Sequence, residues 1–346
     1  MLPFAFTRLL KQRALVLSLL IVCLFLAVRY NYGNDYQTYR EMFYYGSLRS
    51  YIEPGFGFLS KLFSGLGFYY LVAFISIINI TVLYFFIKCY VAENYRWMAV
   101  SIYILSYELM LINASAMRQS IAISLCIIAT IIVLNKKNLL YSIALVLIAQ
   151  CFHRSAAAML IFLLYFYCLE KYGISIIGFI VLSLVEIVVA IIVSAPLAGY
   201  LAPKLLAGDD FYVYIDSMSG GTISSGLGVL MFLLLFGYGI AVLDFKNRVH
   251  LFILLSYQFQ ILFLVGGITF AILSRFSMYF EIFNVAYYPL LIKQTNVIEY
   301  KISLAVLLFA LTIWRLMTFF SSYIWNDGFG VYKTIFSAPD IIANIH

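Results

Sequence analysis

The feature that most constrains this chain is a series of long apolar runs with few or no charged residues. The run 174–194 contains a single carboxylate, Glu186, and the run 68–88 contains no charged residue before Lys88. Runs of this length match the ~17–25 residues that an α-helix needs to cross a bilayer. Because the hydrocarbon holds no water, each backbone N–H and C=O must be paired within its own segment, so these runs are helical.

The composition excludes a soluble globular domain. Hydrophobic residues make up 65% of the 346 residues and charged residues 11%, whereas soluble domains average about 45–50% and about 25%. The apolar runs are continuous rather than alternating, which argues against a transmembrane barrel. We therefore predict an all-α, polytopic transmembrane helix bundle, with residues 1–346 forming a single integral membrane domain.

About eleven spans are expected from the apolar pattern, and the first is read as a retained helix rather than a cleaved signal peptide. They lie at 14–28, 68–88, 97–116, 119–135, 139–152, 156–169, 174–194, 227–243, 249–267, 276–292 and 302–320. With the N-terminus inside, three polar stretches fall on the outer side: the loops 29–67 and 195–226 and the tail 321–346.

On this topology lysines are expected mainly on the inner side of the membrane and arginines mainly on the outer side. The inside holds eight lysines and four arginines, and the outside holds three lysines and seven arginines. Arginine can bind a phosphate through two parallel N–H groups, whereas lysine is a point charge. The outer arginines therefore indicate an anionic ligand such as a lipid phosphate or diphosphate. The alternative is that they anchor at headgroups or pair with acidic residues.

Other readings of the charge and of the cysteines find no support. The net charge of +7 comes with no basic run and no aromatic RNA-binding motif, so a nucleic-acid partner is not expected. The five cysteines form no CxxC pair, so neither a disulfide framework nor a zinc site is predicted. The metalloprotease, P-loop and nucleophile-elbow motifs are missing from the sequence.

The short hairpin 138–171 points to a candidate catalytic residue. At ~1.5 Å per residue each of its arms reaches only about 22 Å, and the hydrocarbon core is about 30 Å thick. The turn Phe152-His153-Arg154-Ser155 is therefore expected below the outer surface, in a water-filled cavity with His153 near its floor. Of the three histidines only His153 is well placed for catalysis, and a structural role is weighed equally against it.

Two arginines are further candidates because they lie on very short outer connections. Arg118 sits at a tight turn between two spans, and Arg275 begins the tenth span with Tyr279 one turn below it. Arg118 is expected to line the same cavity as His153, and a functional role is favoured for both arginines. Snorkelling to outer headgroups is the structural alternative.

The first outer loop combines tyrosines, amides and carboxylates, as sugar-binding surfaces do. Its candidate substrate contacts are Arg29, Asp35, Tyr36, Tyr39 and Glu53. An interfacial aromatic belt is the alternative explanation for the tyrosines. Asp209, Asp210 and Asp216 in the second outer loop could bind a divalent cation, but solvated acids are more usual, so no metal and no cofactor are predicted.

Five short motifs in this order resemble the EpsG-like branch of bacterial polysaccharide polymerases, which is related to the O-antigen polymerase Wzy. They are Arg-x-Asn-x-Gly-x-Asp-Tyr (29–36), Glu-Pro-Gly-Phe (53–56), Met-Arg-Gln-Ser-Ile-Ala (117–122), Phe-His-Arg-Ser-Ala (152–156) and Arg-Phe-x-x-Tyr-Phe (275–280). One departure is Arg154, where the family would have Lys. The expected substrate contacts in these motifs also include Gln119, Arg154 and Tyr279.

The resemblance implies a glycosyltransferase of GT-C-like architecture in the bacterial inner membrane, with its active site facing the periplasm. Such enzymes move a glycan chain from its undecaprenyl diphosphate onto a lipid-linked repeat unit, and a chain-length regulator is a possible partner. His153 would then be the general base, with Asp35 or Glu53 next, and Arg118 and Arg275 would hold the diphosphate. Inversion in a single displacement, without a metal, is the simplest scheme.

Two other classes are weighed against the polymerase. A polysaccharide or lipid-linked sugar transporter or flippase is kept open by Glu186, a carboxylate in the middle of a span that could relay a proton. A membrane acyltransferase would also need a histidine, but no acidic residue follows His153 at the usual short spacing.

Overall fold

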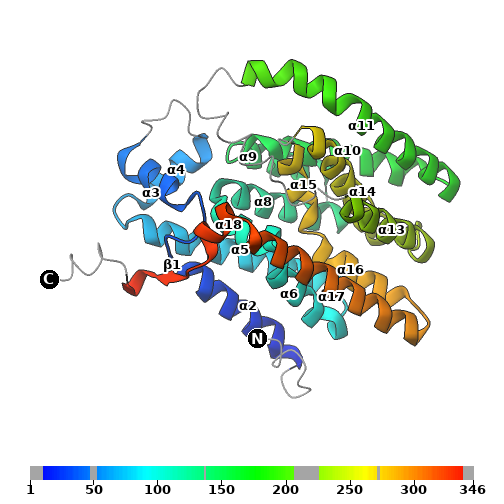
Figure 1. Cartoon of the computed structure of the whole chain (residues 1–346), viewed down its shortest axis with the longest axis horizontal. Helices are drawn as coiled ribbons and strands as arrows, with labels where there is room; N and C mark the ends of the chain where they lie inside the picture. The colour runs from blue at the N-terminus through cyan, green and yellow to red at the C-terminus, as the bar shows by residue number, and fades with distance from the viewer. Residues whose placement is uncertain (1–10, 47–52, 136–137, 206–225, 271–272, 338–346) are drawn as a thin grey trace. The chain divides into compact units, whose positions relative to one another are not determined.

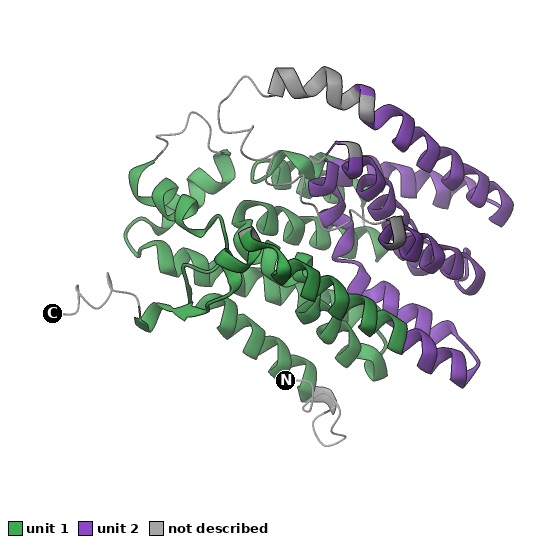
Figure 2. Cartoon of the chain, in the orientation of Figure 1, with its two compact units in different colours: residues 1–157, 306–346 green, residues 158–305 purple. Residues whose placement is uncertain are grey.

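The structure is a computed structural model that describes residues 11–46, 53–135, 138–205, 226–270 and 273–337 (Figure 1). Two compact units divide the chain, and each is described by itself. Unit 1 comprises residues 1–157 and 306–346, and unit 2 comprises residues 158–305 (Figure 2). The single membrane domain expected from the sequence stays a prediction.

Unit 1 is built from longer apolar helices and several shorter segments. Its longer helices are α2 (Lys11–Ala27), α5 (Phe68–Tyr90), α6 (Arg96–Leu105), α8 (Met117–Leu134), α9 (Leu139–Gln150) and the second part of α17 (Ile298–Ser321). The shorter segments are β1 (Arg29–Tyr30), α3 (Tyr36–Tyr45), α4 (Pro54–Phe63), η2 (Glu93–Tyr95), η3 (Glu108–Ile112), α7 (Asn113–Ser115), η4 (Arg154–Ala156), α18 (Tyr323–Phe329), β2 (Lys333–Thr334) and η6 (Ile335–Ser337). Helices α2, α5 and α8 pack in that order at its centre.

Unit 2 is organised around one long buried helix. Its elements are α10 (Ala157–Tyr172), α11 (Ile176–Leu205), α13 (Gly226–Val242), α14 (Arg248–Thr269), α15 (Ser274–Glu281), α16 (Asn284–Gln294) and the first part of α17. Helix α14 contacts α11, α13, α15 and α16. Its packing is aromatic, since Phe263 stacks on both Phe276 and Phe280, with ring centroids 5.4 and 5.7 Å apart.

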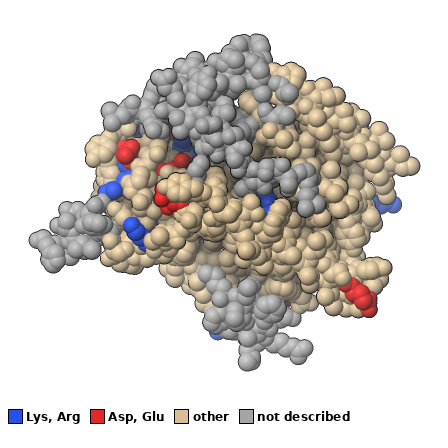
Figure 3. All heavy atoms as spheres, in the orientation of Figure 1, with Lys and Arg blue, Asp and Glu red and all other residues tan. Residues whose placement is uncertain are grey.

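The prediction of an all-α polytopic bundle is confirmed. Within the described residues, six helices are long and apolar enough to cross a membrane: Phe68–Tyr90, Met117–Leu134, Arg154–Tyr172, Ile176–Ser194, Arg248–Ile268 and Ile298–Ser321. Three expected spans correspond to shorter apolar helices, Arg13–Ala27, Leu139–Gln150 and Gly228–Val242. Most of the face in Figure 3 carries no charge, and several charged groups gather at the end where α3 and α4 lie.

Two of the expected spans are broken rather than continuous. The span expected at 97–116 consists of Glu93–Leu105 and Glu108–Ser115, bent by 70°, because Ser106 takes an extended backbone conformation that ends α6. The span expected at 276–292 consists of α15 and α16, which are separate helices. Hydropathy counts apolar residues, so it does not detect such breaks.

The first outer loop is more ordered than its polar composition suggested. It contains α3 and α4, and Pro54 begins α4 at a position where proline is favoured. Tyr36, Tyr39 and Met42 recur on one face of α3 and are buried in one cluster with Phe56 of α4. The two helices therefore form a hydrophobic cover over the ends of α5 and α8.

The C-terminal segment pairs with the start of the first loop. Strands β1 and β2 are antiparallel, with Arg29 opposite Thr334 and Tyr30 opposite Lys333. The Gly33 N–H donates to the Gly328 carbonyl at 2.9 Å. Gly33 has φ +109°, and a Cβ there would lie 3.0 Å from Ser115, so only glycine fits. The pairing places the loop and the tail on the same side of unit 1, as the predicted topology requires.

The predicted topology is tested by cysteine labelling at two exposed positions, in a background without the five native cysteines. Ser64→Cys, between α4 and α5, should react with a membrane-impermeant thiol reagent in cells whose outer membrane has been opened. Asn138→Cys, before α9, should react only after the inner membrane is permeabilised. The reverse pattern would put the first loop on the cytoplasmic side and contradict the topology.

Candidate active site

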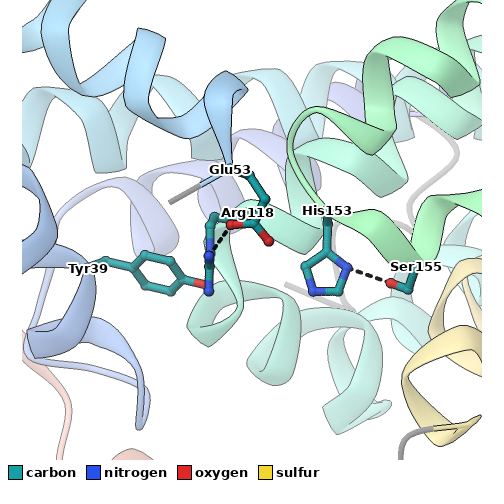
Figure 4. A network of polar contacts seen from close by, with 5 residues as sticks. All are labelled: Tyr39, Glu53, Arg118, His153 and Ser155. Carbon is teal, nitrogen blue, oxygen red and sulfur yellow. Dashed lines mark hydrogen bonds and ion pairs between the residues drawn. The ribbon is translucent and has the colours of Figure 1, made fainter. Parts of the chain in front are cut away.

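Polar side chains from four separate segments lie close together at one end of unit 1 (Figure 4). The Glu53 carboxylate forms an ion pair with Nη1 of Arg118. The Arg118 Nε donates to the Tyr39 hydroxyl at 3.4 Å, and its guanidinium carbon lies 5.4 Å from the Tyr39 ring centroid. In Figure 4 the Glu53 carboxylate is drawn between Arg118 and the imidazole of His153.

Local backbone contacts bring these side chains together. The Gly55 N–H donates to the Cys151 carbonyl at 2.8 Å, so the start of α4 rests on the turn that follows α9. Glu53 lies two residues before this bond and His153 two residues after it. Helices α8 and α9 pack closely, with the Ser142 hydroxyl donating to the Ala129 carbonyl at 2.9 Å. The packing of α8 against α9 therefore brings His153 close to the first turn of α8, which contains Arg118.

Burial explains why Arg118 and Glu53 are paired. Glu53 is only 7% exposed, and a buried carboxylate without a partner is strongly unfavourable. The Arg118 side chain is 21% exposed, so part of its guanidinium still meets solvent. Burial raises the pKa of Tyr39, so this hydroxyl stays neutral near pH 7. The network therefore combines the fixed positive charge of Arg118 with the neutral aromatic ring of Tyr39.

His153 lies beside the ion pair and is only partly buried. Its Nδ1 is in hydrogen-bond contact with the Ser155 hydroxyl, which is itself buried. When Nδ1 donates in this contact, Nε2 carries the lone pair and can accept a proton. Ser155 was not among the expected site residues, although it lies in the same motif two positions after the histidine.

The remaining candidates of unit 1 are at the start of α3 or next to Arg118 and His153 in the chain. The Asp35 N–H donates to the Ser115 hydroxyl at 3.0 Å, which fixes the start of α3. Tyr36 is fully buried, and its hydroxyl donates to the Arg29 carbonyl at 3.3 Å. Gln119 is buried next to Arg118 in the chain, and Arg154 is exposed next to His153.

The surroundings of Arg29 favour a structural role over the substrate contact expected from the sequence. It is 1% exposed, and its guanidinium donates to the Leu26 carbonyl, to the Ser76 hydroxyl at 2.9 Å and to the Ala114 carbonyl at 3.0 Å. Burial lowers its pKa to about 10, so it stays charged at neutral pH. Arg29 therefore ties the first loop to α5 and to the α7 turn, and the site proposed below does not include it.

Arg275 and Tyr279 belong to α15 of unit 2. Arg275 is partly buried, whereas Tyr279 is fully buried, which favours a packing role for the tyrosine. On the same helix the Ser277 hydroxyl donates to the Glu281 carboxylate at 3.1 Å. Because Arg118 and Arg275 lie in different units, their joint grip on one diphosphate stays a prediction.

The described part of the chain contains no group of three or more His, Cys, Asp or Glu residues arranged to hold a metal ion. Asp209, Asp210 and Asp216, the acids considered for a divalent cation, lie outside the described residues. Metal-independent catalysis therefore stays a prediction.

The contact between α4 and the His153 turn yields a stability prediction. A Cβ at Gly55 would lie 2.9 Å from both the Cys151 carbonyl and the Phe152 ring. Gly55→Ala should therefore lower the free energy of unfolding by about 1–3 kcal/mol, although alanine favours helices by about 1 kcal/mol.

Gly65→Ala is the matched control, because a Cβ there meets nothing within 4 Å. Thermal unfolding of both variants in detergent gives the comparison. Equal melting temperatures for the two variants would show that α4 does not rest on this turn.

Comparison with known proteins supplies the family. No curated protein and no solved structure shows significant similarity to the chain. The sequence profile of the EpsG family matches residues 13–334, which is nearly the whole chain. EpsG-like proteins are polymerases of the Wzy type. With its multi-pass helical fold and a match of this extent, the chain belongs to the EpsG family.

Proposed function

We propose that the chain is a repeat-unit polymerase of a bacterial polysaccharide, either an O-antigen or an exopolysaccharide. In this proposal it transfers a glycan chain from undecaprenyl diphosphate onto a lipid-linked repeat unit at the outer face of the cytoplasmic membrane. Family membership supports the polymerase class. The observation that carries the reaction is the Arg118–Glu53–Tyr39 network with His153 beside it.

Arg118 is proposed to bind the lipid diphosphate, which is the leaving group. Negative charge grows on the diphosphate as its bond to the sugar breaks, and a cation already oriented there stabilises that charge. Glu53 and Tyr39 hold the guanidinium in place before the substrate arrives. Because Arg118 is partly exposed, its side chain is accessible to a phosphate. Arg275 is kept as a second proposed contact.

His153 is proposed to be the general base for the acceptor hydroxyl. The acceptor oxygen attacks the anomeric carbon and forms the new C–O bond. The bond to the diphosphate oxygen breaks, and its electron pair leaves with the lipid diphosphate. The hydroxyl proton passes to Nε2 of His153, with Nδ1 engaged by Ser155. One displacement of this kind inverts the anomeric configuration and needs no covalent intermediate.

The substrate contacts proposed around this centre are those that surround the network. Asp35, Gln119 and Arg154 are the polar candidates in unit 1, and the Tyr39 ring provides an apolar face of the kind that sugars stack on. Tyr36 is buried in the hydrophobic cluster under α3, so we assign it a packing role. A chain-length regulator is a proposed partner that rests on the family resemblance alone.

A transporter or flippase is the second candidate, and one contact favours it. Glu186 on α11 accepts a hydrogen bond from the Tyr165 hydroxyl at 2.7 Å and another from the Gln258 amide. A carboxylate held in this way within a span is typical of proton relays. Extension of lipid-linked units by purified protein separates the classes, because a flippase moves the unit without lengthening it.

The role of Arg118 is tested by Arg118→Lys in purified protein supplied with lipid-linked repeat units. Lysine keeps the charge but loses the two parallel N–H groups of the guanidinium. Turnover should therefore fall at least about tenfold, equivalent to a rise of about 1.4 kcal/mol in the activation free energy. Glu186→Gln is the control and should extend chains at the normal rate. Normal turnover in a folded Arg118→Lys variant would contradict the diphosphate contact and would favour a role for Arg118 as a headgroup anchor.

The role of His153 is tested by separating donor binding from chain extension. His153→Gln can form hydrogen bonds but accepts no proton, so extension should slow by about 10²-fold or more while the affinity for the lipid-diphosphate donor stays close to normal. His153→Ala should behave in the same way. A glutamine variant that extends chains normally would make the histidine a positioning residue, and Glu53 or Asp35 the next candidate for the base.

A further inference from the structure

A second buried ion pair lies in unit 1, apart from the candidate active site. The Glu108 carboxylate of η3 pairs with the Arg315 guanidinium of α17, and both side chains are largely buried. The Arg315 guanidinium carbon lies 5.6 Å from the Tyr107 ring centroid. Tyr107 in turn stacks on Phe319 with ring centroids 4.4 Å apart. Charge and aromatic contacts therefore join the same two segments.

This pair stands at the break of a bent span. Helix α6 ends at Leu105, and the chain resumes at Glu108 in a single turn of π-helix, bent by 70° from α6. Such turns are rare and are found mostly at functional sites. The Asn113 amide donates to the Glu108 carbonyl at 3.2 Å and to the Leu109 carbonyl at 2.9 Å. Side chains thus satisfy backbone groups that the irregular helix would leave unpaired.

The segment after the break, Glu108–Ser115, is called the arm. Its end contacts the first outer loop at two points: the Ala114 carbonyl accepts from Arg29, and the Ser115 hydroxyl accepts from the Asp35 N–H, each at 3.0 Å. Arg118 follows only three residues after Ser115, in the first turn of α8. The angle of the arm therefore sets where both Arg118 and the start of α3 lie.

Only the ion pair holds the arm by charge to α17. A buried charge in a bilayer needs a partner of opposite sign, so Glu108 and Arg315 stabilise one another and fix the two helices at this contact. Arg315 lies 207 positions from Glu108 in the chain, so the contact is tertiary and not a local feature of the break.

We propose that Glu108 and Arg315 are positioning residues that set the angle of the arm and thereby place Arg118 for glycosyl transfer. The proposal rests on the polymerase function proposed above and adds two residues that do not touch the substrate. Loss of either partner leaves the other charge buried without a counter-charge and shifts the arm. Loss of both removes that unbalanced charge, although the arm is then no longer held to α17 by the ion pair.

The test uses Glu108→Gln, Arg315→Gln and the double variant. Ala116→Cys, in a background without the five native cysteines, reports the geometry of the arm through its rate of thiol labelling. Each single change should alter that rate at least about threefold and lower kcat for chain extension at least about tenfold, with KM for the acceptor changed less than about twofold. The double variant should be no slower than the slower single variant, because the two residues act as one unit.

The ion pair between Arg248 and Glu170 in unit 2, 3.0 Å apart, provides the matched control. Arg248→Gln with Glu170→Gln should leave labelling at position 116 and kcat unchanged. Unchanged labelling in the single Glu108 and Arg315 variants, or losses of kcat that multiply in the double variant, would overturn the proposal. If a single variant fails to fold, the double variant tests the proposal instead. Its rate of thiol labelling at position 116 must still differ from that of the parent protein.

The outcomes also separate this proposal from the polymerase function. A parent protein that folds but extends no glycan would contradict the proposed function, while labelling at position 116 would still report whether the ion pair holds the arm. Altered labelling with normal kcat would show that the arm moves without affecting Arg118, which would equally overturn the positioning role.

Discussion

Charge in a chain that lies mostly in hydrocarbon must be matched inside the protein, because no water is present to solvate it. Three arginines of unit 1 show how this requirement is met. Arg118 pairs with Glu53, Arg315 with Glu108, and Arg29 donates to two carbonyls and a hydroxyl. Apart from the Arg29 bond to Leu26, which is local, these contacts join segments that are distant in sequence. The polar interactions that solvate the charges are therefore also those that position the first loop, the arm and α8.

This requirement qualifies the argument from the surplus of outer arginines. The sequence predicts an anionic ligand for the arginines expected on the outer side, yet three of these arginines differ in their burial and their partners. Arg29 is enclosed and bonded to protein groups, and Arg315 supports a bent span. Arg118 alone among these three combines partial exposure with a position beside a histidine and a tyrosine. Exposure and neighbours, rather than residue type, separate a ligand contact from a structural cation.

The sequence predicted the helices well because apolar length is a direct requirement of the bilayer. It also predicted that His153 lies in the turn of a short hairpin, and the structure has this residue between α9 and η4. The depth of the turn below the outer surface stays a prediction. The break at Ser106 was beyond the reach of hydropathy, since it depends on one backbone conformation. The pairing of Glu108 with Arg315 could not be predicted either, because a single sequence does not show which distant residues meet. The available signals were two charged residues inside expected spans, Glu108 in 97–116 and Arg315 in 302–320.

The antiparallel pairing of Arg29–Tyr30 with Lys333–Thr334 has a consequence for biosynthesis. Its two strands lie near opposite ends of the described chain, and all of unit 2 is synthesised between them. During synthesis the first loop therefore exists without its partner strand until unit 2 has been made. The β1–β2 pairing of unit 1 forms only after the later strand has been synthesised, so the end of unit 1 that holds the candidate site is completed among the last steps of assembly.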